Sequence, residues 1–269
     1  MKILAIDSSG LTASVAVLED DKLTAEYSVN YKKTHSQTLV PMMDAIRGMT
    51  ELDLTTIDAI AVAAGPGSFT GLRIGSATAK GLGLALGKPI IPVPTVDGLA
   101  YQMYGTDKLI CPIMDARRSQ VYTGLYEFGK DGEESPLSYT LHILKEQCAV
   151  SIEEIAGCCN ELGREVVFLG DGVPVFADRL RSLMKVPYSF APAHKRMQSA
   201  AAVGVYAGIL YQKGIFESAA EHQPEYLRLS QAERERKEAG IAADSAAIYK
   251  TDKVKAGMPG TAKSHGAKP

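Results

Sequence analysis

The sequence predicts an α/β protein of two duplicated lobes. The first lobe opens with the buried-strand pattern KILAID at residues 2–7, and the second opens with ICPIMD at residues 110–115. Each pattern ends in an aspartate and continues into a hairpin pattern. Strand and helix patterns alternate after the first hairpin, which favours an α/β architecture. The likeness of the two halves is a duplication of the fold rather than a short solenoid repeat.

The first lobe spans residues 1–106. Asp20 and Asp21 separate two short apolar runs, as the turn of a hairpin does. A 3–4 spacing of apolar residues then predicts a helix over residues 34–49, with Ser36 as its N-cap and Pro41 in or near its first turn. The remaining expected elements are a strand at 57–64, a glycine-rich helix after Gly71, a strand at 89–94 and a helix that opens at 95.

The second lobe spans residues 107–196. Its expected elements are strands at 109–115, 120–127, near 137–142 and at 165–170, and helices at 151–160 and 173–185. An apolar helix of small residues at 199–212 is expected to pack back on the first lobe, and residues 224–228 have the pattern of an ordered segment. From residue 231 to 269 the chain is polar and rich in Gly, Ala and Lys, so we expect disorder there.

The bulk composition excludes several classes of protein. The 269 residues carry a net charge of −2, with 46% hydrophobic and 22% charged residues, which argues against non-specific nucleic-acid binding as the main activity. The four cysteines form no CxxC pair, which disfavours a zinc site and indicates reduced thiols. No apolar run reaches the roughly 18 residues of a membrane span. The start shows no secretory hydrophobic region, so we expect a cytoplasmic protein without membrane contact.

Each lobe has a candidate phosphate loop. Ser8 and Ser9 follow Asp7 at the end of the first strand, where backbone N–H groups and hydroxyls can hold a phosphate. The counterpart in the second lobe follows Asp115. Two such loops facing each other across a cleft hold ATP in the fold shared by actin, sugar kinases and Hsp70. Two purely structural turns are the alternative, and the bulky Arg117 and Arg118 favour it in the second lobe.

The run from Gly65 to Gly87 combines a helix pattern with many glycines. A glycine in a helix interior costs about 1 kcal/mol relative to alanine, so close packing must offset it. One row of this helix is Gly71, Gly75, Ala79 and Gly83, and the neighbouring row is Arg73, Ala77, Gly81 and Ala85. The preceding GPGSFTG matches neither a Walker loop nor GxGxxG, which favours close helix packing over phosphate binding.

The sequence gives little support for a metal site or for serine hydrolase activity. A helical metal pair needs a second histidine four residues after His35, and that position is Leu39. No GxSxG nucleophile motif occurs, and Ser68 has a base only if the fold brings His35 to it. We therefore expect no metal ligands and no catalytic residues. Leu39, Met42, Met43, Ile46 and Met49 form a methionine-rich stripe, which is either ordinary core or a surface that repacks against partner helices.

Six strings resemble the bacterial TsaB (YeaZ) family: MKILAIDSS, THSQTLVPMMD, AAGPGSFTGLRIG, MDARRSQVYTGLYE, FLGDGV and PEYLR. They occur in the family's order and cover about residues 1–230. The resemblance implies an actin-like ASKHA fold, built from two ribonuclease H-like lobes. It also implies a role in making threonylcarbamoyladenosine at adenosine 37 of tRNAs that read codons beginning with A.

The resemblance further implies a non-catalytic subunit. Its partners would be a TsaD-like catalytic subunit and a TsaE-like ATPase, with tRNA contacted through the complex. Chains of the TsaD type carry an HxxxH pair on the first helix, and Leu39 breaks that pair here. We expect no cofactor for the chain alone, and ATP or ADP at the complex interface. An ATP-using, sugar-kinase-like enzyme and a glycoprotease-like peptidase stay open as alternatives.

The family also forms homodimers through the same helices when its partner is absent. This implies one shared interface on the two helices of the first lobe. The residues expected in it are Leu39, Met42, Met43, Ile46, Gly71, Gly75, Ala79 and Gly83.

Overall fold

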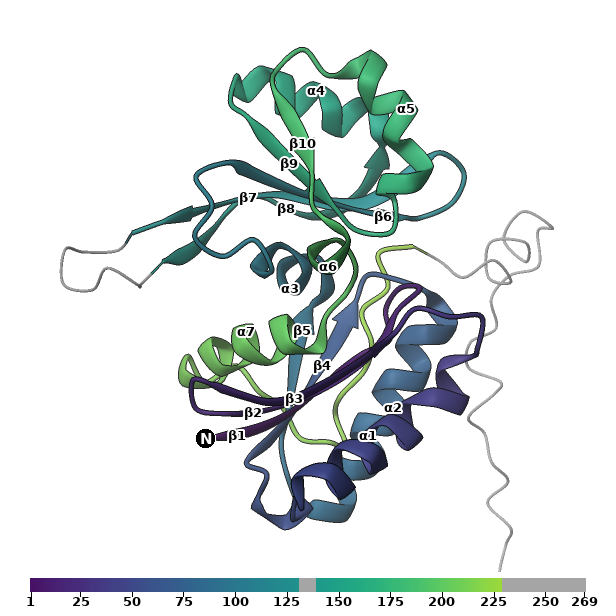
Figure 1. The fold of residues 1–269 in the computed structure, drawn as a ribbon, viewed down its shortest axis with the longest axis vertical. Helices are drawn as coiled ribbons and strands as arrows, with labels where there is room; N and C mark the ends of the chain where they lie inside the picture. Colours follow the sequence, from purple (N-terminus) through teal and green to yellow (C-terminus); the bar gives the residue numbers. More distant parts are fainter. Residues whose placement is uncertain (131–138, 229–269) are drawn as a thin grey trace, which may run out of the picture. The chain divides into compact units, whose positions relative to one another are not determined.

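Two five-stranded mixed sheets organise the chain, one formed by each half of the sequence (Figure 1). The computed structural model describes residues 1–130 and 139–228. The first sheet has the order β3-β2-β1-β4-β5, with β1 Lys2–Asp7, β2 Ala13–Glu19, β3 Lys22–Val29, β4 Ala59–Gly65 and β5 Ile90–Pro94. The second has the order β10-β9-β6-β7-β8, with β6 Leu109–Asp115, β7 Gln120–Gly129, β8 Thr140–Ser151, β9 Val166–Leu169 and β10 Tyr188–Phe190.

The two sheets have the same topology. Strand β1 pairs antiparallel with β2 and parallel with β4, and β6 pairs in the same way with β7 and β9. Written from its other edge, the second sheet has the order β8-β7-β6-β9-β10. Each of these strands corresponds to the strand at the same place in the first sheet. This is the ribonuclease H-like arrangement, and its duplication confirms the predicted actin-like ASKHA fold.

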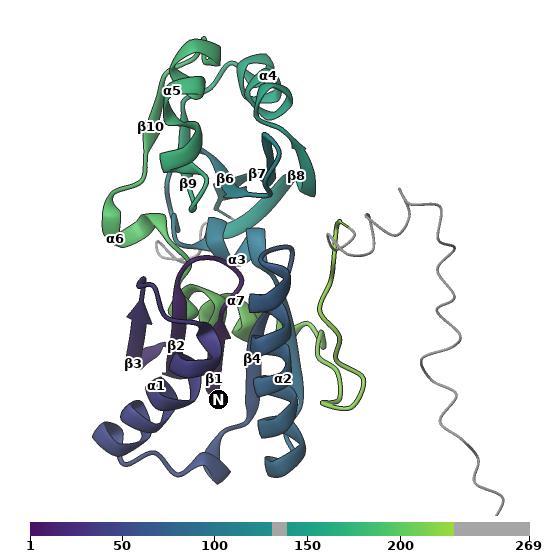
Figure 2. The ribbon, with the colours of Figure 1, turned by 90° about the vertical axis from the view of Figure 1, so that its right-hand side faces the viewer.

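Helices cover both faces of the first sheet (Figure 2). Helices α1 (His35–Thr50) and α2 (Phe69–Leu86) pack on one face, and α7 (Ala200–Gln212) packs on the other. Successive side chains of β1 point to opposite faces of the sheet, and both faces are apolar. Leu4 and Ile6 lie in the core under α1, while Ile3 and Ala5 lie in the core under α7. The contacts of α7 with β1 and β2 place it on the first lobe.

The second lobe repeats this layering. Helices α4 (Ile152–Leu162) and α5 (Val173–Leu183) pack on one face of its sheet. Helix α3 (Thr95–Tyr101), which lies within the residues expected to form the first lobe, packs in the core on the other face of the second sheet. There the Tyr126 hydroxyl donates to Asp97 Oδ1 at 2.7 Å, which joins β7 of the second lobe to α3.

The expected elements differ from the observed ones in a few places. The short η1 (Leu54–Thr56), β10 and α6 (Ala193–Arg196) were not predicted, because three or four residues carry no periodicity. The strand expected near 137–142 lies partly outside the described residues, and β8 extends to Ser151. Helix α1 begins at His35 with Thr34 as its N-cap, so Ser36 as N-cap is wrong, and Pro41 lies in the second turn. The tail 231–269 lies outside the described residues.

Candidate functional site

The loop after β1 is closed by hydrogen bonds to its own chain. Asp7 is buried, and its Oδ1 accepts from the Ser9 amide at 2.9 Å and from the Ser9 hydroxyl at 2.6 Å. The Ser8 hydroxyl donates to the carbonyl oxygen of Gly71 at 2.8 Å. Both hydroxyls and the Ser9 amide thus donate within the protein, and a phosphate would have to displace these bonds.

Burial raises the pKa of Asp7 to about 6, although the two hydrogen bonds from Ser9 and the charge of His35 oppose the rise. His35 Nε2 lies 2.9 Å from the carbonyl oxygen of Gly10. Because a carbonyl oxygen only accepts, Nε2 carries the proton. His35 therefore ties the start of α1 to this loop, and the position four residues on, Leu39, is buried in the core.

The matching loop after β6 is built differently. The Asp115 carboxylate pairs with Arg117 at 2.9 Å, and the Asp115 amide donates to Asp171 Oδ1 at 3.1 Å. Arg117, Arg118 and Ser119 have φ angles of 62°, 55° and 58°, a left-handed run that non-glycine residues seldom adopt. Both arginine side chains are exposed. They stand where a phosphate loop would carry small residues.

The two loops meet between the lobes. A backbone hydrogen bond from Leu11 opposes the burial that raises the pKa of Asp171, so Asp171 of the second lobe lies against the first-lobe loop. Gln198 fills the space beside Gly10, where an added Cβ would lie 2.2 Å from Gln198 Nε2. Neither Asp171 nor Gln198 was predicted. For Asp171 a signal was present, because an aspartate lies close after the end of β9, just as Asp7 ends β1. For Gln198 the sequence carried no such signal.

The structure tests two catalytic arrangements: a metal site and a pair formed by Ser68 and His35. Within residues 1–130 and 139–228, no three His, Cys, Asp or Glu side chains are grouped to hold a metal ion. Ser68 Oγ accepts from the Gly71 amide at 3.3 Å as the N-cap of α2, while His35 is engaged by Gly10. The fold therefore gives Ser68 and His35 separate partners.

No helix in the described ranges is long and apolar enough to cross a bilayer.

The glycine row of α2 faces the protein's own interior. A Cβ on Gly71 would lie 2.0 Å from the Ser8 carbonyl oxygen, one on Gly75 2.4 Å from Ser8 Oγ, and one on Gly83 2.7 Å from Ala219 Cβ. Ala79 is fully buried in the same row. The expected close approach to the helix backbone is confirmed. The expectation that this row is exposed and available to a partner helix is wrong, because the β1 loop and Ala219 pack against it.

Four of the five residues in the apolar stripe of α1 face inward, and the fifth, Met49, is exposed. Leu39, Met42 and Ile46 are buried in the core under the first sheet, and Met43 packs against that core in part. These residues are ordinary core, not a free surface. Other residues of the two helices are exposed, among them Val40, Asp44, Arg47, Gly48 and Met49 of α1, and Thr70, Arg73, Ala77, Gly81, Leu84 and Ala85 of α2. We name these eleven residues the α1–α2 surface.

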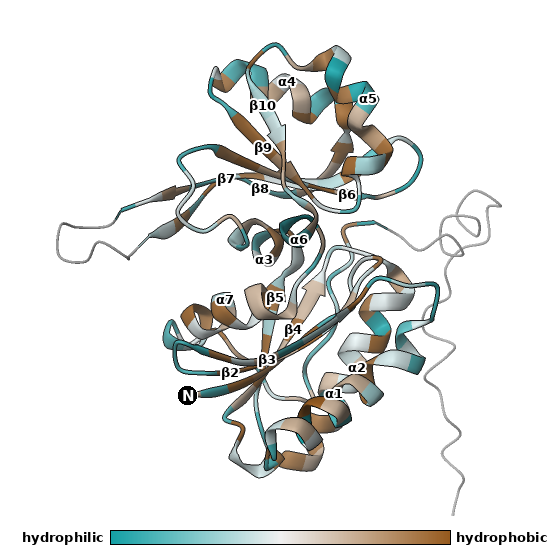
Figure 3. Cartoon of the chain, viewed as in Figure 1, coloured by the Kyte–Doolittle hydropathy of each residue, from teal (hydrophilic) through white to brown (hydrophobic). Residues whose placement is uncertain are grey.

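The α1–α2 surface is unusual for its small and apolar side chains. Val40 is 58% exposed, Met49 84% and Leu84 63%. Nothing lies within 4 Å of a Cβ added to Gly81, so this glycine opens onto free space. Figure 3 shows hydrophobic stretches along α1 in brown. Helices α1 and α2 contact each other, so these residues lie on neighbouring helices.

Fold and site together define a class of protein: a two-lobed, actin-like chain whose loops at Asp7 and Asp115 are closed by internal hydrogen bonds and an ion pair. The family described as TsaD, tRNA N6-adenosine threonylcarbamoyltransferase, matches residues 22–236. The tRNA threonylcarbamoyladenosine biosynthesis protein TsaB of Bacillus subtilis is 33% identical over 241 residues, which cover 90% of each chain. TsaB of Escherichia coli is 36% identical over 135 residues, 49% of this chain and 58% of that one.

The solved structure of YeaZ from Pseudomonas aeruginosa gives a TM-score of 0.69 at 25% identity, over 84% of this chain and 99% of that one. The chain belongs to the TsaB (YeaZ) family.

Proposed function

We propose that this chain is a non-catalytic subunit in the biosynthesis of tRNA threonylcarbamoyladenosine. It binds a TsaD-like catalytic subunit and supports transfer of the threonylcarbamoyl group to adenosine 37 of tRNA. A TsaE-like ATPase joins the same cytoplasmic complex, and tRNA is contacted through that complex. The names of the relatives support the pathway. The internally bonded loops at Asp7 and Asp115 support a role without chemistry of its own.

The α1–α2 surface is the observation that carries this proposal. Its small residues allow a partner helix to approach closely, and its exposed valine, methionine and leucine supply apolar area for an interface. Arg47 and Arg73 lie among them and suit the polar rim of such an interface. When the catalytic subunit is absent, the same surface pairs two copies of this chain. ATP or ADP, if the complex uses one, binds at the interface with the partner.

A pair of matched substitutions tests this assignment. Val40 on α1 is 58% exposed and Val175 on α5 is 59% exposed, so a glutamate at either position is tolerated by the folded chain. Val40→Glu buries a charge in the proposed interface, which costs several kcal/mol in an apolar contact. Val175→Glu leaves that interface untouched. Light scattering after size-exclusion chromatography of the chain, of a TsaD-like subunit and of their mixture measures the association.

The expected result is a one-to-one complex that Val40→Glu weakens at least tenfold while Val175→Glu does not. Thermal unfolding of each variant confirms that it is folded. Equal association of both variants would exclude the α1–α2 surface. A mixture that shows no complex at all would overturn the proposed function itself.

A further inference from the structure

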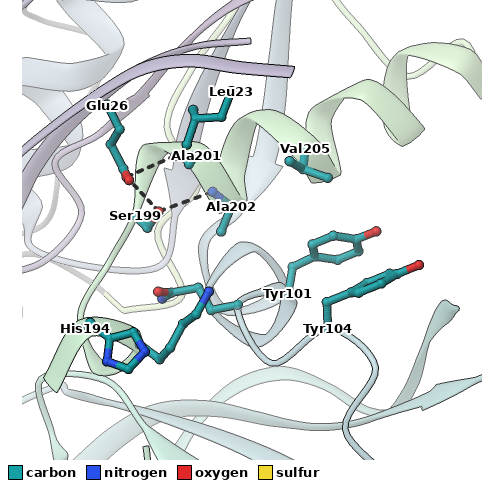
Figure 4. A pocket seen from close by; sticks show the side chains of 11 residues that line it. Leu23, Glu26, Tyr101, Tyr104, His194, Ser199, Ala201, Ala202 and Val205 are labelled. Atoms are coloured by element: carbon teal, nitrogen blue, oxygen red, sulfur yellow. Dashed lines mark hydrogen bonds between the residues drawn. The ribbon is translucent and has the colours of Figure 1, made fainter. Parts of the chain in front are cut away.

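A pocket separate from the two aspartate loops lies beside the N-terminal half of α7 (Figure 4). Its volume is about 490 Å³, within the range of small-molecule sites. Strand β3, α3 with the residues after it, α6 and α7 form it. The lining residues are Leu23, Glu26, Tyr101, Gln102, Tyr104, His194, Lys195, Ser199, Ala201, Ala202 and Val205. Asp7, Asp115 and Asp171 are not among them.

One end of the pocket is aromatic and apolar. The rings of Tyr101 and Tyr104 have centroids 5.7 Å apart, and Figure 4 shows them side by side below Val205. Leu23, Tyr104 and Val205 are 44–47% exposed. Large apolar side chains this exposed, gathered around one hollow, indicate a surface that a flat apolar group covers. The alanines of α7 leave room for such a group.

The other end is positively charged. His194 and Lys195 belong to α6, are exposed, and make no ion pair in the described part of the chain. Glu26 is the acidic residue of the lining, and its Oε1 already accepts from the Ser199 hydroxyl at 2.7 Å and the Ala201 amide at 3.2 Å. Glu26 is thus compensated by the start of α7, and the ammonium group of Lys195 is left to attract an anion.

We propose that this pocket binds a nucleotide, with the base against the exposed ring of Tyr104, which packs on the buried Tyr101, and the phosphate at His194 and Lys195. The combination of a flat aromatic ring and an anionic group matches the two ends of the pocket. A lipid would lack the ring, and a sugar phosphate would leave the apolar end uncovered. This site goes beyond the proposed function, because a docking subunit needs no nucleotide of its own. No metal ion is required.

The nucleotide has two sources with the same chemistry: a free nucleotide, or one unit of a single-stranded RNA. Titration calorimetry of the full chain without magnesium compares AMP, adenosine, inorganic phosphate and a short oligoadenylate. AMP is expected to bind more tightly than adenosine or phosphate, because each of these contacts one end only. Tighter binding of the oligoadenylate than of AMP identifies the RNA source, and the reverse order identifies the free nucleotide.

Two variants and one control locate the site. Lys195→Ala removes a charge, and Ala202→Trp fills the hollow, so each is expected to weaken AMP binding at least tenfold. Lys213→Ala is the control, since Lys213 is exposed at the opposite end of α7. Thermal unfolding checks each fold, and Lys195→Ala alone decides if Ala202→Trp is unstable. The proposal is overturned if neither AMP nor the oligoadenylate binds at about 1 mM, or if binding survives both variants. Association with a TsaD-like subunit is measured without nucleotide, so the two proposals fail independently.

Discussion

The Ser8 hydroxyl donates a 2.8 Å hydrogen bond to the carbonyl oxygen of Gly71, across 63 residues of sequence. The loop after β1 therefore lies directly on the first turn of α2. The Ser68 amide adds a second link, because it donates to the Ser9 carbonyl oxygen at 2.7 Å. A side chain at position 71 would collide with Ser8, and one at position 67 with Ser9, so Gly67 and Gly71 serve the packing of the two loops. A phosphate loop would need these same groups unengaged.

Alanine should have opposite effects at two glycines of α2. Gly81→Ala is expected to raise the free energy of unfolding by about 1 kcal/mol, because alanine has the higher helix propensity and its Cβ meets nothing within 4 Å. Gly71→Ala is expected to lower it by about 1–3 kcal/mol, because the Cβ would lie 2.0 Å from the Ser8 carbonyl oxygen. Urea denaturation followed by circular dichroism measures both.

Ala85 offers a check on this comparison. It is exposed on the same helix, so Ala85→Gly should lower the free energy of unfolding by the same propensity difference of about 1 kcal/mol. If Gly71→Ala were neutral, the contact between the β1 loop and α2 would not be tight.

Asp97 should make stability depend on pH. Burial raises its pKa from 3.8 to about 6, against the hydrogen bond from Tyr126. Below about pH 3 the carboxyl is neutral in the folded and unfolded chains alike. Between about pH 4 and 6 the unfolded chain releases its proton first, so the free energy of unfolding falls as pH rises. Relative to Asp97→Asn, the wild type should lose roughly 3 kcal/mol between pH 3 and 7.

Tyr126→Phe is a second variant that tests the same dependence of stability on the pKa of Asp97. It removes the hydroxyl that stabilises the ionised carboxylate, so the pKa of Asp97 should rise further. The fall in stability should then extend above pH 6. Denaturation midpoints at several pH values test both variants, and parallel pH profiles for wild type and Asp97→Asn would contradict the argument.

The fold was largely predictable because its signals are periodic. The runs KILAID and ICPIMD are continuous apolar strands that end in aspartate, and the structure makes them the central strands β1 and β6 of equivalent sheets. What could not be predicted lacks a pattern. Three residues suffice for β10, and the charged stretch Lys145–Gln147 hides the long β8.

The sequence predicted which residues form the notable helix face, but not whether that face points into the protein or toward solvent. The spacing of Gly71, Gly75, Ala79 and Gly83 identified one helix face, yet spacing does not tell whether a partner or the same chain lies against it. The neighbouring row of Arg73, Ala77 and Gly81 proves to be the exposed one. Contacts such as Gln198 on Gly10 join distant parts of the chain, and only the tertiary structure brings them together.

Magnesium should leave nucleotide binding by the isolated chain unchanged. A sugar-kinase-like enzyme would hold magnesium–ATP between the Asp7 and Asp115 loops, and Asp115→Asn would weaken that binding. Here the Asp115 carboxylate is occupied by Arg117, and the serines at positions 8 and 9 already donate to their own chain. Calorimetry with ATP, with and without magnesium, on wild type and Asp115→Asn decides this. A magnesium-dependent affinity lost in Asp115→Asn would restore the kinase alternative.

Replacing Gln198 should stabilise the protein, although the residue is buried. Gln198 is 2% exposed, and neither its Oε1 nor its Nε2 has a hydrogen-bond partner among the described residues. A buried amide without partners costs about 1–3 kcal/mol, so Gln198→Leu is expected to raise the free energy of unfolding by about 1 kcal/mol. Gln102→Leu is the matched control, because Gln102 Nε2 donates to the Met197 carbonyl oxygen at 2.6 Å, and it should be destabilising. If Gln198→Leu instead lost stability as Gln102→Leu does, the amide of Gln198 would be bonded in solution, and water or a ligand would reach the space between Gly10 and α7.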